Sequence, residues 1–312
     1  MKVTDSSGTL HYEWIEDWAK TPDTPETRAN GRTHGVAEAK DGNVYVFHQS
    51  TPAVAVYDQS GRFLRSFADK FSGAHGLTLV EENGVEYLWL TNEAGGPVGK
   101  LTLAGEAVQW IDKPSFPPYP EANYMPTWVA VNPNGGDIWV TDGYGASLVH
   151  RYDKNGKYLA TIDGTDGAGH FACPHAVWFD TRGGRDPELY IADRANRRVQ
   201  VYDGEGTFKR SFGEDFLIHP CAFASFGDVL YVPELYGRLA VLNGNDQLIG
   251  YVGEDKEISG GKPPEGYPNF PRERVVPGKF VAPHGVGTGA DGSVYVVEWY
   301  YPGGRITRLV PS

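Results

Sequence analysis

The sequence predicts an all-β fold, a six-bladed β-propeller whose blades each contain four strands. Three observations support this prediction. A pair of short apolar runs recurs six times along the 312 residues, and a repeat of this size is typical of propellers and solenoids. Turn-forming residues separate the runs, and the chain contains 40 Gly and 22 Pro. No glycine fingerprint opens a helix, which argues against a dinucleotide-binding fold. We therefore expect a single propeller domain over residues 1–312.

Each repeat begins with a leading strand, and its second strand ends in a polar residue or a histidine. The leading strands are expected at 34–37, 75–78, 127–130, 175–178, 221–224 and 284–287, and the second strands at 44–48, 88–92, 138–142, 189–193, 230–234 and 294–298. Third strands are expected at 54–58, 149–153, 199–203 and 239–243, and fourth strands at 63–67, 158–162 and 208–212. Leading and second strands form an antiparallel hairpin, so the start of one lies beside the end of the other.

The last repeat is one strand short, because it stops after 305–309, while an apolar run at 11–15 belongs to no complete repeat. We expect this N-terminal strand to complete the last blade and close the ring, which removes an unpaired edge. Two long insertions, at 112–124 and 254–280, follow fourth strands. Strand direction assigns them to the side where the leading strands start, and long loops of this kind often form lids or binding walls.

The composition of the chain limits which partners and which cellular compartment are expected. The formal net charge of −12 disfavours nucleic acid and anionic membrane surfaces as partners. No apolar run reaches membrane-spanning length, and residues 1–7 lack the apolar core of a signal peptide. As written, the chain is expected to be cytoplasmic and monomeric, or secreted if a leader has been removed. Cys173 and Cys221 are too few for a disulfide framework; they are either two thiols or one bridge between neighbouring repeats.

Histidine opens the leading strand in four of the six repeats. Three of these residues, His75, His175 and His284, belong to alternate blades. Innermost strands line the central channel of a propeller, so these side chains are expected to converge on one axis with a fourth direction open. Three imidazoles with one open position suit a catalytic zinc ion, or less selectively another divalent transition metal.

The repeats resemble those of the NHL-repeat propellers over nearly the whole chain. Within that group, several motifs resemble the peptidylglycine α-hydroxyglycine amidating lyases. The motifs are Ala-His-Gly-Leu at 74–77, Thr-Asp-Gly-Tyr-Gly-Ala-Ser at 141–147, Cys-Pro-His-Ala at 173–176, Ile-Ala-Asp-Arg at 191–194 and Ala-Pro-His-Gly at 282–285. The resemblance implies that the three histidines hold zinc, that Tyr144 is a catalytic tyrosine and that Arg194 assists it. It also implies cleavage of the N–C bond of a carbinolamide, giving an amide and glyoxylate. A guanidinium and a divalent ion would favour the phenolate of Tyr144, which could then act as a general base.

The chain departs from the family at several places. Where the family has an arginine beside the substrate, this chain has Gln49, which weakens the case for a carboxylate substrate. An aspartate linked to a structural calcium in the family is Gly285 here, so we expect no structural Ca²⁺. His34 adds a fourth imidazole, as an extra ligand, a proton carrier or a hydrogen-bonded rim residue.

Acidic residues end four second strands, and repeated acids at that position are typical of turn capping and hydrogen bonding. Glu298 could instead orient a ligand histidine or exchange protons. We expect substrate contacts from Gln49, His34, Glu298 and Tyr300. The substrate is expected to be a small molecule or a peptide. Two alternatives remain: a metal-dependent hydrolase or eliminase acting on another small polar molecule, and a non-catalytic propeller that binds a protein or a glycan.

Overall fold

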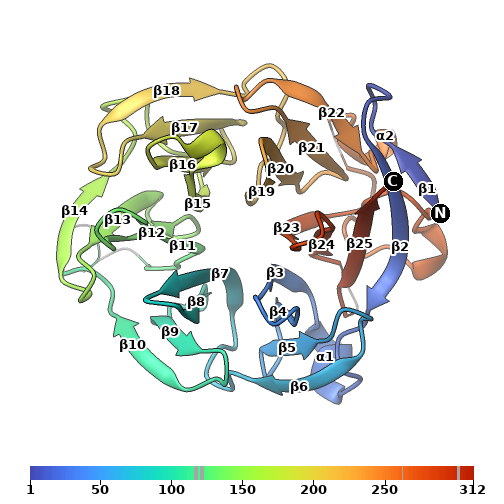
Figure 1. The fold of residues 1–312 in the computed structure, drawn as a ribbon, viewed down its shortest axis with the longest axis horizontal. Helices are drawn as coiled ribbons and strands as arrows, with labels where there is room; N and C mark the ends of the chain where they lie inside the picture. Colours follow the sequence, from blue (N-terminus) through green and yellow to red (C-terminus); the bar gives the residue numbers. More distant parts are fainter. Residues whose placement is uncertain (116–118, 120–122, 262, 301–302) are drawn as a thin grey trace. The chain divides into compact units, whose positions relative to one another are not determined.

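The computed structural model describes residues 1–115, 119, 123–261, 263–300 and 303–312. Parts of both predicted long loops therefore lie outside the described residues. The chain divides into two compact units, one formed by residues 1–70 and 223–312 and the other by residues 71–222. Each unit contributes three antiparallel sheets (Figure 1), and the fold is the predicted six-bladed β-propeller. The prediction that residues 1–312 form a single domain stays a prediction.

The unit of residues 71–222 contains blades 2, 3 and 4, each of four strands. Blade 2 consists of β7 (Ala74–Glu82), β8 (Val85–Asn92), β9 (Val98–Thr102) and β10 (Ala107–Ile111). Blade 3 consists of β11 (Trp128–Val131), β12 (Ile138–Asp142), β13 (Leu148–Tyr152) and β14 (Tyr158–Ile162). Blade 4 consists of β15 (Pro174–Asp180), β16 (Glu188–Asp193), β17 (Arg198–Tyr202) and β18 (Phe208–Phe212), with a short 3₁₀ turn, η1 (Arg182–Gly184), between its first two strands.

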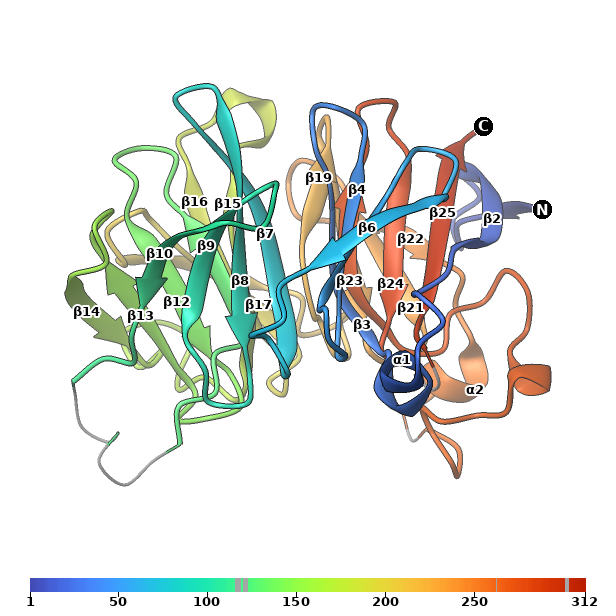
Figure 2. The ribbon, with the colours of Figure 1, turned by 90° about the horizontal axis from the view of Figure 1, so that it is seen from below.

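The other unit contains blades 5, 6 and 1. Blade 5 consists of β19 (Ala224–Phe226), β20 (Val229–Glu234), β21 (Arg238–Leu242) and β22 (Leu248–Val252), and blade 1 of β3 (Thr33–Glu38), β4 (Val44–His48), β5 (Val54–Tyr57) and β6 (Phe63–Phe67). Blade 6 consists of β23 (Pro283–Thr288), β24 (Val294–Glu298), β25 (Arg305–Pro311), β2 (His11–Ala19) and β1 (Lys2–Thr4). Three short helical segments, α1 (Pro25–Asn30), α2 (Lys256–Ser259) and η2 (Arg272–Arg274), connect these strands. Figure 2 shows α1 and α2 at the same end of this unit.

The N-terminal segment completes blade 6 as a strand. β2 pairs antiparallel with β25, with Trp14 opposite Leu309, and β1 adds a fifth strand beyond it. The sequence therefore identified the strand that the last repeat lacks. Ring closure by this strand stays a prediction.

The leading hairpins have the predicted register and one feature that was not predicted. Pro174 pairs with Asp193 and Pro283 pairs with Glu298, so the start of each leading strand lies beside the end of its second strand. In both cases the register shifts directly after the proline. His175 and His284 therefore lie in β-bulges, as does His34. A bulge breaks the alternation of a strand and redirects its side chain, a feature often found next to active sites.

Blade 5 departs from the prediction at its leading strand. The strand was expected to begin at Cys221, but β19 covers only Ala224–Phe226. The carbonyl oxygen of Cys221 is instead the partner of His175 Nδ1, at 2.7 Å. The Cys221 carbonyl thus pairs with the His175 side chain and not with a neighbouring strand.

Apolar side chains of neighbouring blades form the core within each unit. In the unit of residues 71–222, Trp89, Val98, Val129 and Val140 belong to one buried cluster. Burying such side chains contributes roughly 1.5–3 kcal/mol each relative to exposure. The sheets on either side of the cluster are thereby fixed, together with the loops at their ends.

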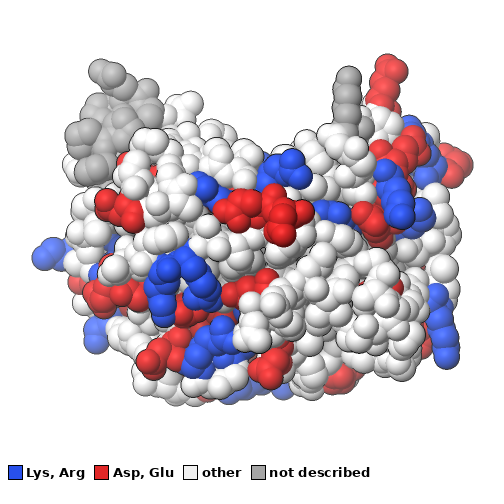
Figure 3. Space-filling view, turned by 90° about the horizontal axis from the view of Figure 1, so that it is seen from above, with Lys and Arg blue, Asp and Glu red and all other residues white. Residues whose placement is uncertain are grey.

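The described residues contain no helix long and apolar enough to cross a membrane. On the face drawn in Figure 3, basic and acidic side chains are interspersed, and neither sign forms an unbroken field.

Candidate functional site

Four of the predicted site residues lie together in the unit of residues 71–222. His75 and His175 have ring centres 4.7 Å apart. The hydroxyl of Tyr144 lies 3.1 Å from Nε2 of His75 and 3.1 Å from Nε2 of His175. Arg194 Nη1 donates a hydrogen bond to the same hydroxyl oxygen at 3.2 Å. One phenolic oxygen is therefore shared by two imidazoles and a guanidinium.

Backbone carbonyls fix the tautomer of both histidines. His75 Nδ1 lies 2.7 Å from the carbonyl oxygen of Thr127, and His175 Nδ1 lies 2.7 Å from that of Cys221. Because a carbonyl oxygen only accepts hydrogen bonds, each Nδ1 carries a proton, and in a neutral ring Nε2 keeps its lone pair. Metal-binding histidines are commonly oriented in this way. Both side chains are fully buried, and each presents an Nε2 lone pair, the kind of donor that binds a divalent transition metal.

The remaining predicted ligand has the same arrangement within the other unit. His284 Nδ1 lies 3.2 Å from the carbonyl oxygen of His34, and the two rings lie 4.4 Å apart. Nδ1 of His284 therefore carries the proton as well, which leaves Nε2 as a donor atom for a metal. His34 supplies the carbonyl that orients His284. Its role as a ligand, a proton carrier or a rim residue stays open.

The environment of Tyr144 opposes phenolate formation in the protein alone. Burial raises the pKa of Tyr144 above its ordinary value, and the nearby positive charge of Arg194 only partly offsets this. For Arg194, burial alone would lower the pKa. Interactions with Tyr144 and with the thiols of Cys221 and Cys173 outweigh burial and raise the pKa above its ordinary value, so the guanidinium stays charged. The expected phenolate therefore requires more positive charge than Arg194 supplies.

Arg194 is not the partner of the aspartate that precedes it. Asp193 pairs with Arg198 at 2.8 Å, and no carboxylate among the described residues forms an ion pair with Arg194. Its guanidinium carbon lies 5.1 Å from the centre of the Tyr144 ring, a distance at which a cation is attracted to an aromatic face. Arg194 thus contacts Tyr144 both at its hydroxyl and over its ring, in agreement with the assisting position that the resemblance implies.

Polar residues at the ends of second strands hold the segments that lead into the histidine strands. Asn92 Oδ1 accepts from Gly73 N at 2.9 Å, two residues before His75. Asp193 Oδ1 accepts from Ala172 N at 2.8 Å, and Glu298 Oε1 accepts from Ala282 N at 3.1 Å. The hydrogen-bonding role expected for these acids is therefore present.

Asp142 has the same role in blade 3 and belongs to a buried network. It accepts from Met125 N at 2.7 Å and from the Tyr119 hydroxyl at 2.6 Å. Because Tyr119 has one proton to give, His150 Nε2, which lies 2.7 Å away, must donate to it. Burial lowers the pKa of His150 to about 4. The network fixes the turn that carries Tyr144, and the sequence did not reveal it.

The candidate substrate contacts lie in the unit that contains His284. Glu298 is fully buried and forms an ion pair with Arg305. The side chain of Gln49 accepts from Asn30 Nδ2 at 3.5 Å. Tyr300 donates to the carbonyl of Phe270 at 2.6 Å. Contact of these residues with a substrate stays a prediction.

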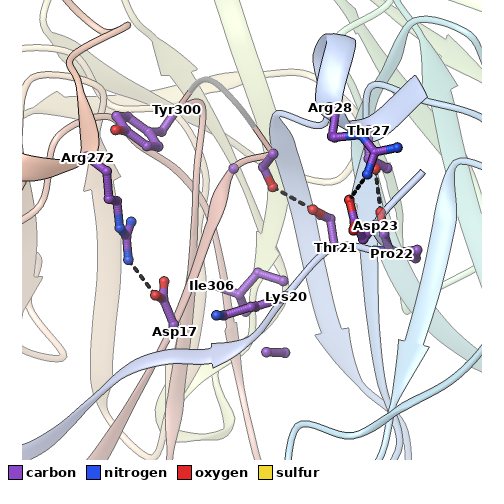
Figure 4. A pocket seen from close by; sticks show the side chains of 13 residues that line it. Asp17, Lys20, Thr21, Pro22, Asp23, Thr27, Arg28, Arg272, Tyr300 and Ile306 are labelled. Atoms are coloured by element: carbon purple, nitrogen blue, oxygen red, sulfur yellow. Dashed lines mark hydrogen bonds and ion pairs between the residues drawn. The ribbon is translucent and has the colours of Figure 1, made fainter. Parts of the chain in front are cut away.

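Tyr300 also lines a cavity of about 400 Å³ (Figure 4). Two of the cations in this cavity already have partners. Arg28 pairs with Asp23 at 2.6 Å, and Arg272 pairs with Asp17 at 2.5 Å. These pairs leave the cavity without a concentrated charge of either sign.

One residue close to His75 was not singled out in the sequence. Glu93 Oε2 lies 3.9 Å from His75 Nε2, and Glu93 lines a cavity of about 420 Å³. Glu93 follows the second strand of blade 2 just as Arg194 follows that of blade 4. Alignment of the repeats could therefore have pointed to it. Neither of the two cysteines near Arg194 forms a disulfide, and burial raises the pKa of Cys173.

Comparison with known proteins relates the chain to propellers of two kinds. No protein-family model matches the chain. NHL repeat-containing protein 3 of Mus musculus is 30% identical over 236 residues, which cover 68% of this chain and 65% of that protein. Peptidyl-alpha-hydroxyglycine alpha-amidating lyase 1 of Drosophila melanogaster is 30% identical over 251 residues, which cover 72% of this chain and 42% of that protein. The chain thus spans less than two thirds of either relative.

Among solved structures, a streptogramin B lyase superimposes with a TM-score of 0.64 at 16% identity, covering 96% of this chain and 98% of that one. Identity this low supports the fold alone. The sequence repeats, the six sheets and the similarity to an NHL repeat-containing protein all indicate the same propeller fold. The chain is a six-bladed β-propeller, and it is similar in sequence to an NHL repeat-containing protein and to peptidyl-alpha-hydroxyglycine alpha-amidating lyases.

Proposed function

We propose that the protein is a metal-dependent lyase that cleaves the N–C bond of a carbinolamide in a small molecule or a peptide. The observation that carries this proposal is the position of the Tyr144 hydroxyl, 3.1 Å from Nε2 of both His75 and His175 and 3.2 Å from Arg194 Nη1. Two unprotonated imidazole nitrogens and a charged guanidinium at one oxygen are not required for a tyrosine with a structural role. They suit a tyrosine that transfers a proton next to a bound cation.

The metal is assigned to His75, His175 and His284. Support comes from the backbone carbonyl that each Nδ1 faces, and from the motifs shared with the amidating lyases. Zinc is the first choice for three neutral imidazoles, and another divalent transition metal is the second. Such an ion supplies positive charge that polarises an oxygen of the substrate.

The residues of the chain carry the proton transfer. The substrate has the form R–CO–NH–CH(OH)–R′. As a phenolate, Tyr144 Oη takes the proton of the carbinol hydroxyl, the carbon–oxygen double bond forms, and the C–N bond breaks. The resulting phenol gives the same proton to the amide nitrogen, so that Tyr144 returns to the phenolate. The products are R–CO–NH₂ and an aldehyde, which is glyoxylate when R′ is a carboxylate, and no water or oxidant is consumed. Arg194 holds the phenolic oxygen in place and stabilises negative charge on it.

Release of glyoxylate from an N-acyl-α-hydroxyglycine tests this proposal. The zinc-loaded protein should release glyoxylate and the primary amide in equal amounts, and the Tyr144→Phe variant should release neither above background. Absence of glyoxylate from fully metal-loaded protein would sink the proposal in this form. The hydrolase and eliminase alternatives would then be tested with other small polar substrates.

A further inference from the structure

Another cavity, of about 570 Å³, lies in the unit of residues 71–222, toward the strand ends that face away from the histidines. Its wall includes Val80 of β7, Val131 of β11 and Phe179 of β15. His75 is near the start of β7, and about 16 Å of extended strand separate it from Val80 at about 3.3 Å per residue. The cavity is therefore distinct from the candidate metal site.

The hairpin of β7 and β8 closes one side of this cavity. These strands contain 9 and 8 residues, whereas β11 and β12, the corresponding strands of the next blade, contain 4 and 5. Residues 81–83, at the tip of the long hairpin, line the cavity. Blade 3 is complete with the shorter hairpin, so the extra length in blade 2 adds a wall to the cavity and is not needed for a blade.

Two buried donors of this cavity lack hydrogen-bond partners among the described residues. Trp89 is 1% exposed, and its indole Nε1 has no partner. In blade 6 the same position of the second strand is Tyr295, whose hydroxyl donates to Glu38 at 2.8 Å. Asn132 is 5% exposed, and its Oδ1 accepts from Asn134 N at 2.9 Å, while its Nδ2 has no partner in the described part of the chain. A buried donor that loses water without gaining a partner is unfavourable, so both groups suit a ligand with acceptor oxygens.

The charges around the cavity balance, which favours a neutral occupant. Glu82 forms an ion pair with Lys100 at 2.5 Å. Glu81 and Lys154 also line the cavity, and their charges are opposite. Thr181, which is exposed, adds a hydroxyl that makes no capping hydrogen bond. The occupant therefore has to meet several dispersed donors and acceptors without a net charge of its own.

Trp178 gives the cavity an aromatic wall. It is half-buried and lines the cavity, and its ring packs edge-on against Tyr190, with ring centres 5.7 Å apart at 86°. A rigid aromatic side chain supplies contact area at a low cost in conformational entropy. A sugar ring combines an apolar C–H face, which fits against such a wall, with hydroxyl groups that both donate and accept. A neutral sugar thus matches this cavity better than an anion or a purely apolar molecule.

We propose that this cavity binds a neutral sugar, as a monosaccharide or a disaccharide. Its volume of about 570 Å³ falls within the range of roughly 300–1,000 Å³ that is typical of small-molecule sites. Sugar oxygens accept hydrogen bonds from Trp89 and Asn132, and the apolar face of the ring lies against Trp178. The inference is independent of the proposed function, because it involves no metal ion and no residue of the candidate metal site.

The indole N–H signals of the full chain test this inference by NMR. Labelling with ¹⁵N at the indoles gives one signal for each of the 8 tryptophans, and the variants Trp89→Phe and Trp178→Ala assign the two that matter. The probes are D-glucose, D-galactose, D-mannose, cellobiose and lactose. At least one of them should shift both signals, with a dissociation constant of about 1 mM or tighter. Sorbitol, an open-chain polyol without a ring face, should shift neither signal.

Matched variants show whether the cavity is the binding site. Trp178→Ala should weaken binding at least about tenfold, and Trp89→Phe should weaken it roughly three- to tenfold through loss of one hydrogen bond. Trp110→Ala changes an exposed tryptophan outside the cavity, and Trp139→Phe changes a buried indole at the same strand position of blade 3. Both controls should keep the affinity of the parent. If Trp89→Phe does not fold, Asn132→Asp removes the other donor and should weaken binding by a similar factor.

Three results would overturn the inference. They are unshifted Trp89 and Trp178 signals with all of these sugars, unchanged affinity in Trp178→Ala, and equal shifts with sorbitol and glucose. Tighter binding of indole than of every sugar would also overturn it and would assign the cavity to aromatic molecules. Neither metal content nor glyoxylate release enters these measurements, so failure of the proposed lyase reaction would leave their outcome unaffected.

Discussion

Arg194 donates a hydrogen bond to the phenolic oxygen of Tyr144 over 3.2 Å, and its guanidinium carbon lies 5.1 Å from the centre of the tyrosine ring. The two residues come from the ends of second strands in neighbouring blades. Arg194 has no ion-pair partner among the described carboxylates, so its charge is directed at the tyrosine.

Replacement of Tyr144 by Phe should abolish turnover without loss of metal. Loss of a positioned proton-transfer group costs roughly 100- to 10,000-fold in rate. His75 and His175 keep their backbone carbonyl partners in the variant, so zinc content should stay near that of the parent. Glyoxylate release and elemental analysis measure the two quantities. Tyr158→Phe, in β14, serves as the control, and equal turnover in parent and Tyr144→Phe would rule out the assigned role.

Arg194 and Arg198 should separate function from stability. Arg194→Gln removes the donor to Tyr144 and should lower kcat roughly 100- to 1,000-fold, with a small change in the free energy of unfolding. Arg198→Gln leaves the buried carboxylate of Asp193 without its main partner, which should cost about 3 kcal/mol of unfolding free energy. Denaturant unfolding and kinetics on both variants check this. A reversed pattern would show that Arg194 is structural.

Acid should destabilise the fold through two buried histidines. Burial lowers the pKa of both His48 and His150 to about 4, below the value of about 6.5 expected in the unfolded chain. The unfolded chain therefore binds protons first as the pH falls, and stability declines between about pH 6.5 and 4. Thermal unfolding at several pH values measures the decline. The double variant His48→Gln and His150→Gln should show a shallower decline, and an unchanged slope would contradict the explanation.

Much of the fold could be predicted from the repeats. The strand patterns identified six blades and assigned the N-terminal strand to the last blade, because alternation and turn residues are local properties of the sequence. The β-bulges at His34, His175 and His284 could not be predicted in this way. A bulge depends on which backbone groups find partners, and for His175 the partner is the carbonyl of Cys221, which the repeat alignment assigned to a strand.

The sequence named part of the residue cluster around Tyr144, and the roles of these residues stay predictions. Motifs identified Tyr144, Arg194, His75 and His175, and the structure brings these four together. Glu93 was missed because a single glutamate after a strand has the same local pattern as a capping acid. The hydrogen bonds among Tyr119, Asp142 and His150 were missed because they join a loop to two strands that are distant in sequence. Such contacts follow from tertiary packing and not from spacing.

The central claim is that the histidines bind a metal, and elemental analysis tests it most directly. Tag-free protein would be compared with its His175→Ala variant and with His170→Gln, in which an exposed histidine outside the site is changed. We predict about one zinc or other transition metal ion per chain in the parent and in His170→Gln, and loss of that ion in His175→Ala. Absence of metal from the parent after reconstitution, or full retention of metal in His175→Ala, would contradict the account.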